Sequence, residues 1–201
     1  MTEIPAEAFA PILEELERRH LDVNHYRITS GDGRSQAFGV VNKRCQAPDY
    51  SRQNWRRPYL YKLLLDFGAK YVTDISWTSI TVNENYSAGP HYDRGNTGLS
   101  FLVGCGDYKG GALRCHEGDL SGAHDIRHRP LITSFGETLH SVEPWTGHRV
   151  SLVYYQLAAA PQLPPPSVRL VEGRWKFFRG EAECEGLPHP LRGRKKKGAA
   201  Q

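Results

Sequence analysis

Short runs of alternating apolar and polar residues dominate the chain from residue 74 to residue 157. The runs are rich in β-branched and aromatic residues, and Gly, Asp, Asn or Pro separates one from the next. They read "ISWTSITVNEN", "LSFLVGCG", "GALRCH", "PLITSF" and "RVSLVYYQL". Such runs, with turn residues between them, are typical of half-buried antiparallel strands. Several such strands in one segment predict an antiparallel barrel or jelly roll.

Two helical patterns and one further strand precede this segment. Apolar side chains recur at helical spacing over residues 6–20, with charged residues on the other face. Residues 58–68 predict a second helix, with Pro58 in its first turn and Gly68 at its end. Residues 36–42, "QAFGVVN", predict a strand. We therefore expect a mainly β fold with flanking helices.

The chain of 201 residues is long enough for one sizeable core. We expect a single domain with three parts: N-terminal helices and strands over residues 1–73, the β core over 74–159, and a C-terminal extension over 160–201. The extension begins with the proline-rich linker "APQLPPPS" and ends in a basic tail. Between them, "VRLVEGRWKFFRG" fits either one more strand pair or a peripheral flap, and both interpretations stay open.

The composition indicates a folded protein with many loops, because 39% of residues are hydrophobic, the mean hydropathy is -0.56 and 20 residues are glycine. No apolar run approaches the roughly 18–20 residues that span a bilayer, and the N-terminus lacks the pattern of a secretory leader. The four cysteines are scattered without a CxxC pair, which predicts reduced thiols. They are Cys45, Cys105, Cys115 and Cys184. We therefore expect an intracellular protein without membrane association.

The net charge of +4 is unevenly placed. Five basic residues occupy the six positions of residues 192–197, and Arg52, Arg56, Arg57 and Lys62 lie among aromatic residues. Such clusters suit phosphate backbones. Two alternatives stay open: the tail is a solvated end or a nuclear-targeting signal, and the second cluster is the solvated basic face at the start of a helix.

Two side chains that bind metals well, His91 and Asp93, lie in a stretch that otherwise predicts the end of a strand. Residues two apart on an extended strand point to the same side, so the imidazole and the carboxylate can meet at one point. His140 begins a later strand and offers a third ligand, and a turn at 144–147 is expected to return the chain beside it. Two histidines and one carboxylate leave coordination positions open, as in non-haem Fe(II) oxygenases.

Arg149 and Ser151 follow this turn on one face of the last predicted strand. A guanidinium can hold a carboxylate through two parallel hydrogen bonds, and a serine hydroxyl adds a donor. The pair therefore suits the far carboxylate of a 2-oxo diacid. Asn83 is a further candidate for binding this cosubstrate, because it lies on the strand before His91, although a structural role in the loop is equally compatible.

Four other histidines are less suited to a metal site. His148 is expected to face away from the side of Arg149. His116, His124 and His128 lack the short spacing that is typical of a zinc site, so we expect them in a loop over the mouth of a pocket.

In this order, "HYD" at 91–93, "GGALR" at 110–114, "LH" at 139–140 and "RVS" at 149–151 resemble the Fe(II)/2-oxoglutarate-dependent dioxygenases. The resemblance implies a double-stranded β-helix, Fe(II) and O₂, 2-oxoglutarate as cosubstrate, and ascorbate as a reductant. It assigns His91, Asp93 and His140 to the iron. It assigns Arg149, Ser151 and Asn83 to 2-oxoglutarate. Each residue alone also has a structural explanation, such as a strand-edge ion pair, but those explanations do not account for the order of the motifs.

The stretch "HYDRGN" at 91–96 resembles the HxDxxN form of the ten-eleven-translocation and base-J-binding-protein families. These families oxidise the methyl group of 5-methylcytosine or thymine in nucleic acid. The resemblance implies a DNA substrate, with 5-methylcytosine converted to 5-hydroxymethylcytosine, and places Asn96 at the base. We predict Arg94 and Arg52 as further substrate contacts. The chain departs from the animal members by lacking a cysteine-rich domain and large inserts.

Two alternative functions stay open. "GGALR" also resembles prolyl and lysyl hydroxylases, so a protein side chain or a small molecule is an alternative substrate for the same chemistry. The second alternative is a binding module that has kept the barrel and lost turnover. For either function we expect a monomer.

Overall fold

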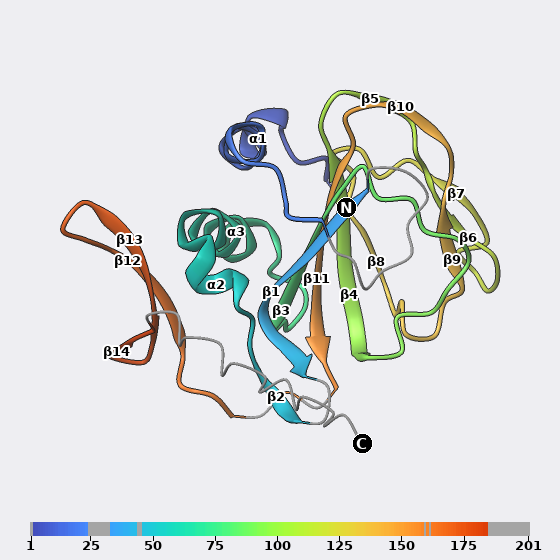
Figure 1. Ribbon diagram of the computed structural model, residues 1–201. Helices are drawn as coiled ribbons and strands as arrows, with labels where there is room; N and C mark the ends of the chain where they lie inside the picture. The colour runs from blue at the N-terminus through green and yellow to red at the C-terminus, as the bar shows by residue number, and fades with distance from the viewer. Residues whose placement is uncertain (1, 24–32, 44–45, 159, 161, 185–201) are drawn as a thin grey trace, which may run out of the picture.

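A six-stranded antiparallel sheet forms the centre of the molecule (Figure 1). The computed structural model describes residues 2–23, 33–43, 46–158, 160 and 162–184. The strand order in the main sheet is β2-β1-β3-β11-β4-β8. The strands are β1 (Arg34–Lys43), β2 (Gln46–Tyr50), β3 (Ser79–Glu84), β4 (Asn96–Cys105), β8 (Leu131–Thr133) and β11 (Val150–Leu157).

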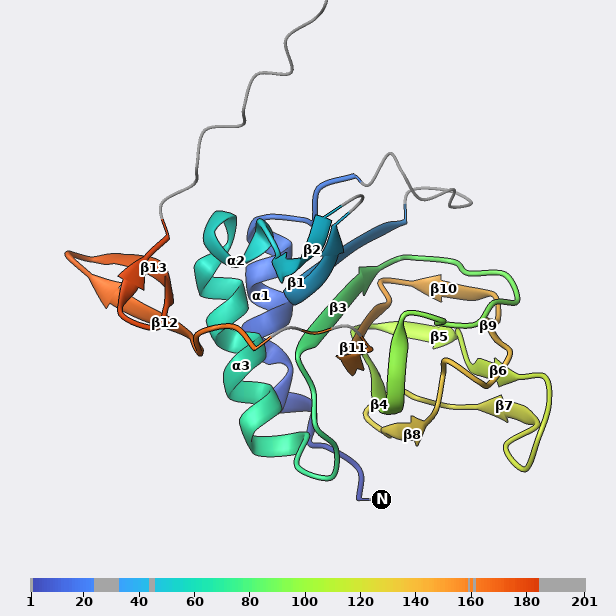
Figure 2. The same ribbon diagram turned by 90° about the horizontal axis from the view of Figure 1, so that it is seen from below.

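Two small sheets face one side of the main sheet in both views (Figures 1 and 2). One has the order β7-β6-β9, and the other pairs β10 with β5. Their strands are β5 (Tyr108–Gly110), β6 (Leu113–Cys115), β7 (Gly122–His124), β9 (His140–Val142) and β10 (Trp145–Gly147). This arrangement confirms the predicted mainly β jelly roll.

Helices cover the opposite side of the main sheet (Figure 2). They are η1 (Ala6–Ala8), α1 (Ala10–Arg18), α2 (Gln53–Arg56) and α3 (Pro58–Tyr71). Alternation along the central strands sends Ile80, Val82, Leu152 and Tyr154 into the helix-side core, where each is fully buried. The intervening residues of β3 and β11 therefore face the small sheets, and the functional side chains are found on this face.

The predicted end of the second helix at Gly68 was wrong. The helix α3 continues to Tyr71, and Gly68 lies inside it. A Cβ atom at this position would lie 2.6 Å from Trp77 Cζ2 and 2.8 Å from Tyr154 Cε1. The glycine therefore allows close packing of the helix on the sheet, and its role is not that of a helix cap.

Residues 166–179 form a strand pair, which resolves the alternative left open by the sequence. The hairpin consists of β12 (Pro166–Val171) and β13 (Arg174–Arg179), and β14 (Ala182–Glu183) adds a short third strand. Phe177 on β13 is buried against the rings of Tyr50, Trp55 and Tyr61. The hairpin thus packs on the outer side of the helices (Figure 2).

The predicted simple turn at 144–147 was also wrong. Trp145–Gly147 form β10, which pairs with β5. The strand β9 pairs with β6, whereas β11 pairs with β3 and β4. The chain therefore crosses from one sheet to the other between His140 and Arg149, as strands of a jelly roll do. Within the described ranges, no helix is long and apolar enough to cross a membrane.

Candidate metal and cosubstrate site

A cavity of about 440 Å³ lies between the main sheet and the small sheets. Its lining includes the side chains of β3 and β11 that point away from the helices. The volume falls within the roughly 300–1,000 Å³ that is usual for small-molecule sites. Apolar side chains from both layers form part of its wall, and they are Leu102, Leu113, Val142 and Val153.

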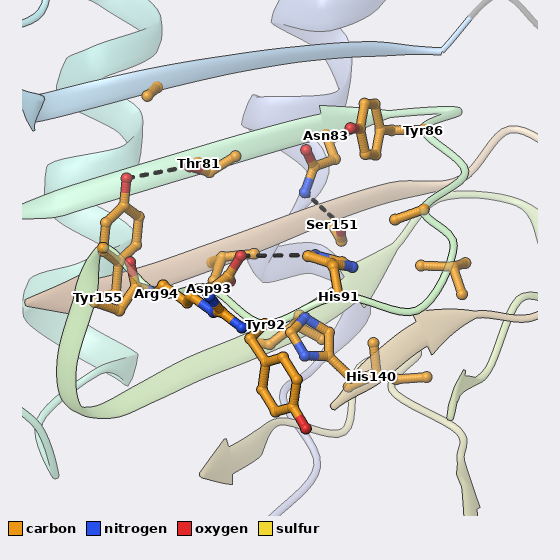
Figure 3. Close-up of a pocket in the computed structure, with 18 of the residues that line it drawn as sticks. Thr81, Asn83, Tyr86, His91, Tyr92, Asp93, Arg94, His140, Ser151 and Tyr155 are labelled. Carbon is orange, nitrogen blue, oxygen red and sulfur yellow. Dashed lines mark hydrogen bonds and ion pairs between the residues drawn. The ribbon is translucent and has the colours of Figure 1, made fainter. Parts of the chain in front are cut away.

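Three potential metal ligands, His91, Asp93 and His140, converge at this cavity (Figure 3). One ligand atom from each lies within 4.8 Å of the others. The backbones of His91 and His140 exchange both hydrogen bonds, at 3.0 and 3.1 Å, and the Asp93 N–H donates to the Phe135 carbonyl at 2.9 Å. His91 lies in an isolated bridge and Asp93 follows outside any strand, so the expected continuous strand through both residues was wrong.

The hydrogen bonds of the two imidazoles leave one nitrogen of each ring for a metal. Nδ1 of His91 donates to the Gly89 carbonyl and Nδ1 of His140 donates to the Thr138 carbonyl, both at 2.8 Å. Such bonds fix the tautomer and direct Nε2 toward a metal. Burial lowers the pKa of His140, which favours the neutral, metal-binding form. The donor set therefore fits an Fe(II) ion.

Arg149 also lines this cavity, and only 2% of its surface is exposed. Within the described part of the chain, no carboxylate lies at ion-pair distance from its guanidinium. Nε donates to the Gly111 carbonyl at 3.1 Å, and the backbone N–H donates to Asn85 Oδ1 at 2.8 Å. Burial lowers the pKa of Arg149. A buried guanidinium without a protein anion suits an anionic ligand.

Asn83 and Ser151 lie side by side near Arg149 (Figure 3). They are register partners on β3 and β11, and Asn83 Nδ2 donates to Ser151 Oγ at 3.3 Å. Asn83 Oδ1 is buried and has no hydrogen-bond partner among the residues that the structure describes. Since buried polar atoms are normally paired, this atom and the Arg149 guanidinium fit a polar cosubstrate. Tyr86 lines the same end, but the left-handed backbone of Asn85 breaks the alternation that would have predicted it.

No protein-family model and no curated protein matches the chain. Solved structures do match. NgTET1 in complex with 5mC DNA gives a TM-score of 0.54 at 15% identity, over 79% of this chain and 71% of that chain. A 2OG-Fe(II) oxygenase family oxidoreductase from Burkholderia pseudomallei gives 0.50 at 18% identity, over 73% of this chain and 77% of that chain. The chain shares the fold of these two structures. The resemblance inferred from the sequence is thus confirmed at the level of the fold.

The other end of the cavity, the outer end, carries Asn96, Arg94, Thr81 and Tyr155. Asn96 begins β4 and is half-buried, and its backbone N–H donates to the Asp93 carbonyl at 2.9 Å. Arg94 is exposed, and the Tyr155 hydroxyl lies 3.5 Å from Thr81 Oγ1 (Figure 3). Thr81 and Tyr155 were missed in the sequence, although alternation places them on the same strand faces as Asn83 and Ser151.

The predicted substrate contact Arg52 does not line the cavity. It precedes α2 on the helix side of the main sheet. Its side chain is exposed. A contact of Arg52 with the phosphates of a substrate outside the cavity stays a prediction.

The wider basic cluster around Arg52 does not form one phosphate-binding surface. Arg57 is buried, lies 3.5 Å from a Glu15 carboxylate oxygen and donates to the Arg19 carbonyl at 2.6 Å. Trp55 packs on the hairpin, and Lys62 pairs with Asp66. The solvated-helix alternative describes this region better. The basic tail at 192–197 lies outside the described residues.

The remaining histidines do not form a second metal cluster within the described ranges. His148 lies 3.1 Å from the buried Glu84 carboxylate, away from the cavity, as expected. His116 contacts Ser141 Oγ and His124 contacts the Leu120 carbonyl, while His128 stacks on Phe9. Three cysteines are free thiols, as predicted, and Cys45 lies outside the described residues. They are Cys105, Cys115 and Cys184.

Proposed function

We propose that the protein is an Fe(II)- and 2-oxoglutarate-dependent dioxygenase. The observation that carries the proposal is one cavity that combines a His-Asp-His cluster with a buried guanidinium, which has no anionic partner in the described part of the chain. Either feature alone has structural explanations. Together they provide separate sites for a metal and for a carboxylate at the same cavity, which a dioxygenase of this fold requires.

The chemistry supplied by bound Fe(II) is the activation of O₂, with 2-oxoglutarate converted to succinate and CO₂ while a substrate C–H group becomes C–OH. The chain's own residues bind and orient the reactants. Arg149 and Ser151 hold the far carboxylate of 2-oxoglutarate, and Asn83 adds an amide at the same end. The apolar wall from Leu102 and Val153 limits the access of water.

As substrate we propose a 5-methylpyrimidine in DNA, with conversion of 5-methylcytosine to 5-hydroxymethylcytosine as the main reaction and thymine as a second substrate. Asn96 supports this proposal because it lines the outer end of the cavity, where its amide can both donate to and accept from a base edge. Arg94 is exposed at the same end and is available to a phosphate. The fold shared with NgTET1, solved in complex with 5mC DNA, agrees with this substrate. The target base must leave the stack to enter the cavity.

One observation favours the alternative of a protein side chain or a small molecule. Arg57, a member of the basic cluster for which phosphate binding was one interpretation, has a structural role in the helix-side core, as does its neighbour Trp55. The described residues therefore offer fewer phosphate contacts than the sequence suggested. A substrate without phosphates needs none of them.

The deciding experiment combines the full-length protein with Fe(II), 2-oxoglutarate and ascorbate. Oligonucleotides that contain 5-methylcytosine or thymine are added, both as single strands and as duplexes. Nucleoside mass spectrometry detects hydroxymethyl products, and succinate is measured in the same tube. Succinate with a hydroxymethyl nucleoside supports both parts of the proposal, whereas succinate with unmodified DNA supports the alternative substrates. The absence of succinate under all conditions contradicts the enzyme.

A further inference from the structure

The guanidinium of Arg149 contacts two aromatic rings, which come from the two strands of one small sheet. Arg149 Cζ lies 5.6 Å from the Tyr108 ring centroid and 5.5 Å from the Trp145 ring centroid. Tyr108 lies on β5 and Trp145 on β10, and in the described structure these strands pair only with each other. The β5–β10 ribbon thus brings one ring from each strand to the same guanidinium.

The chain immediately after β5 adds a backbone contact. The Gly111 carbonyl accepts from Arg149 Nε at 3.1 Å. Gly111 has a φ of +67°, and a Cβ atom there would lie 2.8 Å from Arg149 Cδ and 2.9 Å from Nε. Only glycine allows the backbone to approach the arginine this closely. Since Nε is occupied, a ligand has to bind through the terminal nitrogens.

The hydroxyl of Tyr108 adds a polar contact at the same place. Its side chain is 2% exposed, and its hydroxyl interacts with the Arg149 guanidinium. A Cβ atom added to Gly104 would lie 2.3 Å from this hydroxyl, and Gly104 is the register partner of Ser151. The hydroxyl therefore lies over the strand face that carries Ser151, beside the guanidinium that it helps to hold.

We propose that the β5–β10 ribbon fixes the position of Arg149 through Tyr108, Trp145 and Gly111, and thereby selects the chain length of the 2-oxo diacid. This inference rests on the proposed function. An arginine has many rotamers, and the ring and carbonyl contacts remove that freedom before the ligand arrives. The metal cluster fixes one end of the diacid and the held guanidinium fixes the other. A five-carbon diacid is then favoured over its four- and six-carbon homologues.

The test measures binding without turnover. Protein loaded with Mn(II) under anaerobic conditions is titrated by calorimetry with 2-oxoglutarate, oxaloacetate and 2-oxoadipate, and Mn(II) affinity is measured separately. A cation–aromatic contact supports about a 2- to 30-fold change in affinity. We expect Trp145→Leu to weaken 2-oxoglutarate binding by this factor and to reduce the ratio of the affinity for 2-oxoglutarate to the affinity for 2-oxoadipate. The affinity for Mn(II) should not change. Trp145→Phe, which keeps an aromatic ring, is expected to retain most of the wild-type affinity for 2-oxoglutarate and most of the wild-type affinity ratio.

The control is Trp175→Leu, because Trp175 stacks on Tyr59 outside the cavity and is expected to leave all three affinities unchanged. Tyr108→Phe removes the hydroxyl and keeps the ring. This variant tests the role of the ribbon if Trp145→Leu does not fold. Unchanged affinity and preference in Trp145→Phe, Trp145→Leu and Tyr108→Phe would overturn the inference, as would a parallel loss of Mn(II) affinity. If the wild-type protein fails to bind 2-oxoglutarate at all, the proposed function itself is wrong.

Discussion

The two ends of the cavity differ in how firmly their polar side chains are held. At the inner end, Arg149 and Ser151 are 2% and 3% exposed, and hydrogen bonds or ring contacts fix each of them. At the outer end, Arg94 is exposed and Asn96 is half-buried at the start of a strand. Side chains that are fixed by such contacts bind a small ligand at a low entropic cost, whereas exposed side chains can adapt to a larger ligand.

This difference explains why the reaction type is easier to infer than the substrate. The inner end and the metal cluster consist of buried residues whose chemistry has few other uses. The outer end consists of side chains that could bind many polar groups. Substitutions that affect one end of the cavity and leave the other unchanged therefore test directly whether the two ends have separate roles.

The largest effect is expected from removing a metal ligand that both ends depend on. Asp93→Ala leaves only two imidazoles, so we expect turnover to fall to background and bound Fe(II) to be lost. Succinate formation and metal content measure the two effects. His124→Ala is the matched control, since His124 lies outside the cluster and contacts a backbone carbonyl. Normal kinetics in Asp93→Ala would exclude this metal site.

The next largest effect is expected at the inner end. Arg149→Lys keeps a positive charge but loses the paired donors, so the KM for 2-oxoglutarate should rise. Hydrogen bonds to charged groups contribute about 1.5–3 kcal/mol, which corresponds to about a 10- to 150-fold increase. The KM for the hydroxylated substrate should change little. Arg169→Lys, in an exposed ion pair with Glu181, is the control. An unchanged KM for 2-oxoglutarate would remove Arg149 from the cosubstrate site.

A smaller effect is expected at the outer end. Asn96→Ala removes an amide from the cavity wall, so hydroxylation of 5-methylcytosine should fall by about 2- to 12-fold, as for one net hydrogen bond. The KM for 2-oxoglutarate should not change, and succinate formed without substrate should persist. Parallel assays of nucleoside product and succinate separate these quantities. Equal effects of the substitution on both quantities would show that the two ends are not independent.

The sequence predicted the β core, the metal ligands and the inner end because all three depend on local patterns. Alternation along residues 149–157 was enough to place Arg149 and Ser151 on one face. The His91-Asp93 spacing was also informative, although the structure brings the two side chains together through an irregular segment rather than a strand.

Other features depend on contacts between distant segments and were not predictable from local patterns. Gly68 resembles a helix end, and only the packing of Trp77 shows why it lies inside α3. Arg57 resembles a surface cation, but its partner Glu15 is 42 residues away along the chain. The strand β10 looked like a turn because its partner β5 precedes it by more than thirty residues. Long-range pairing leaves no local signal in these places.

The smallest effect on activity is expected from Glu84, which lies behind the inner end. Glu84 is buried on the helix side and accepts hydrogen bonds from the Leu21 N–H and from His148, the neighbour of Arg149. Burial alone would raise the pKa of Glu84, but hydrogen bonds from His20, Leu21 and His148 outweigh burial and lower it below its ordinary value of 4.5. We expect Glu84→Gln to leave the KM for 2-oxoglutarate nearly unchanged and to reduce the free energy of unfolding by about 1–3 kcal/mol at neutral pH.

The pH dependence of this loss follows from the direction of the pKa shift. Since the pKa of Glu84 is lower in the folded than in the unfolded protein, the stabilisation is complete above pH 4.5 and is lost as the pH falls through the folded pKa. The difference in unfolding free energy between wild type and Glu84→Gln should therefore shrink on acidification below pH 4.5. Urea unfolding at several pH values measures it, with the exposed Glu181→Gln as control. A difference that stays constant with pH would show that Glu84 stabilises the inner end by packing and not by its charge.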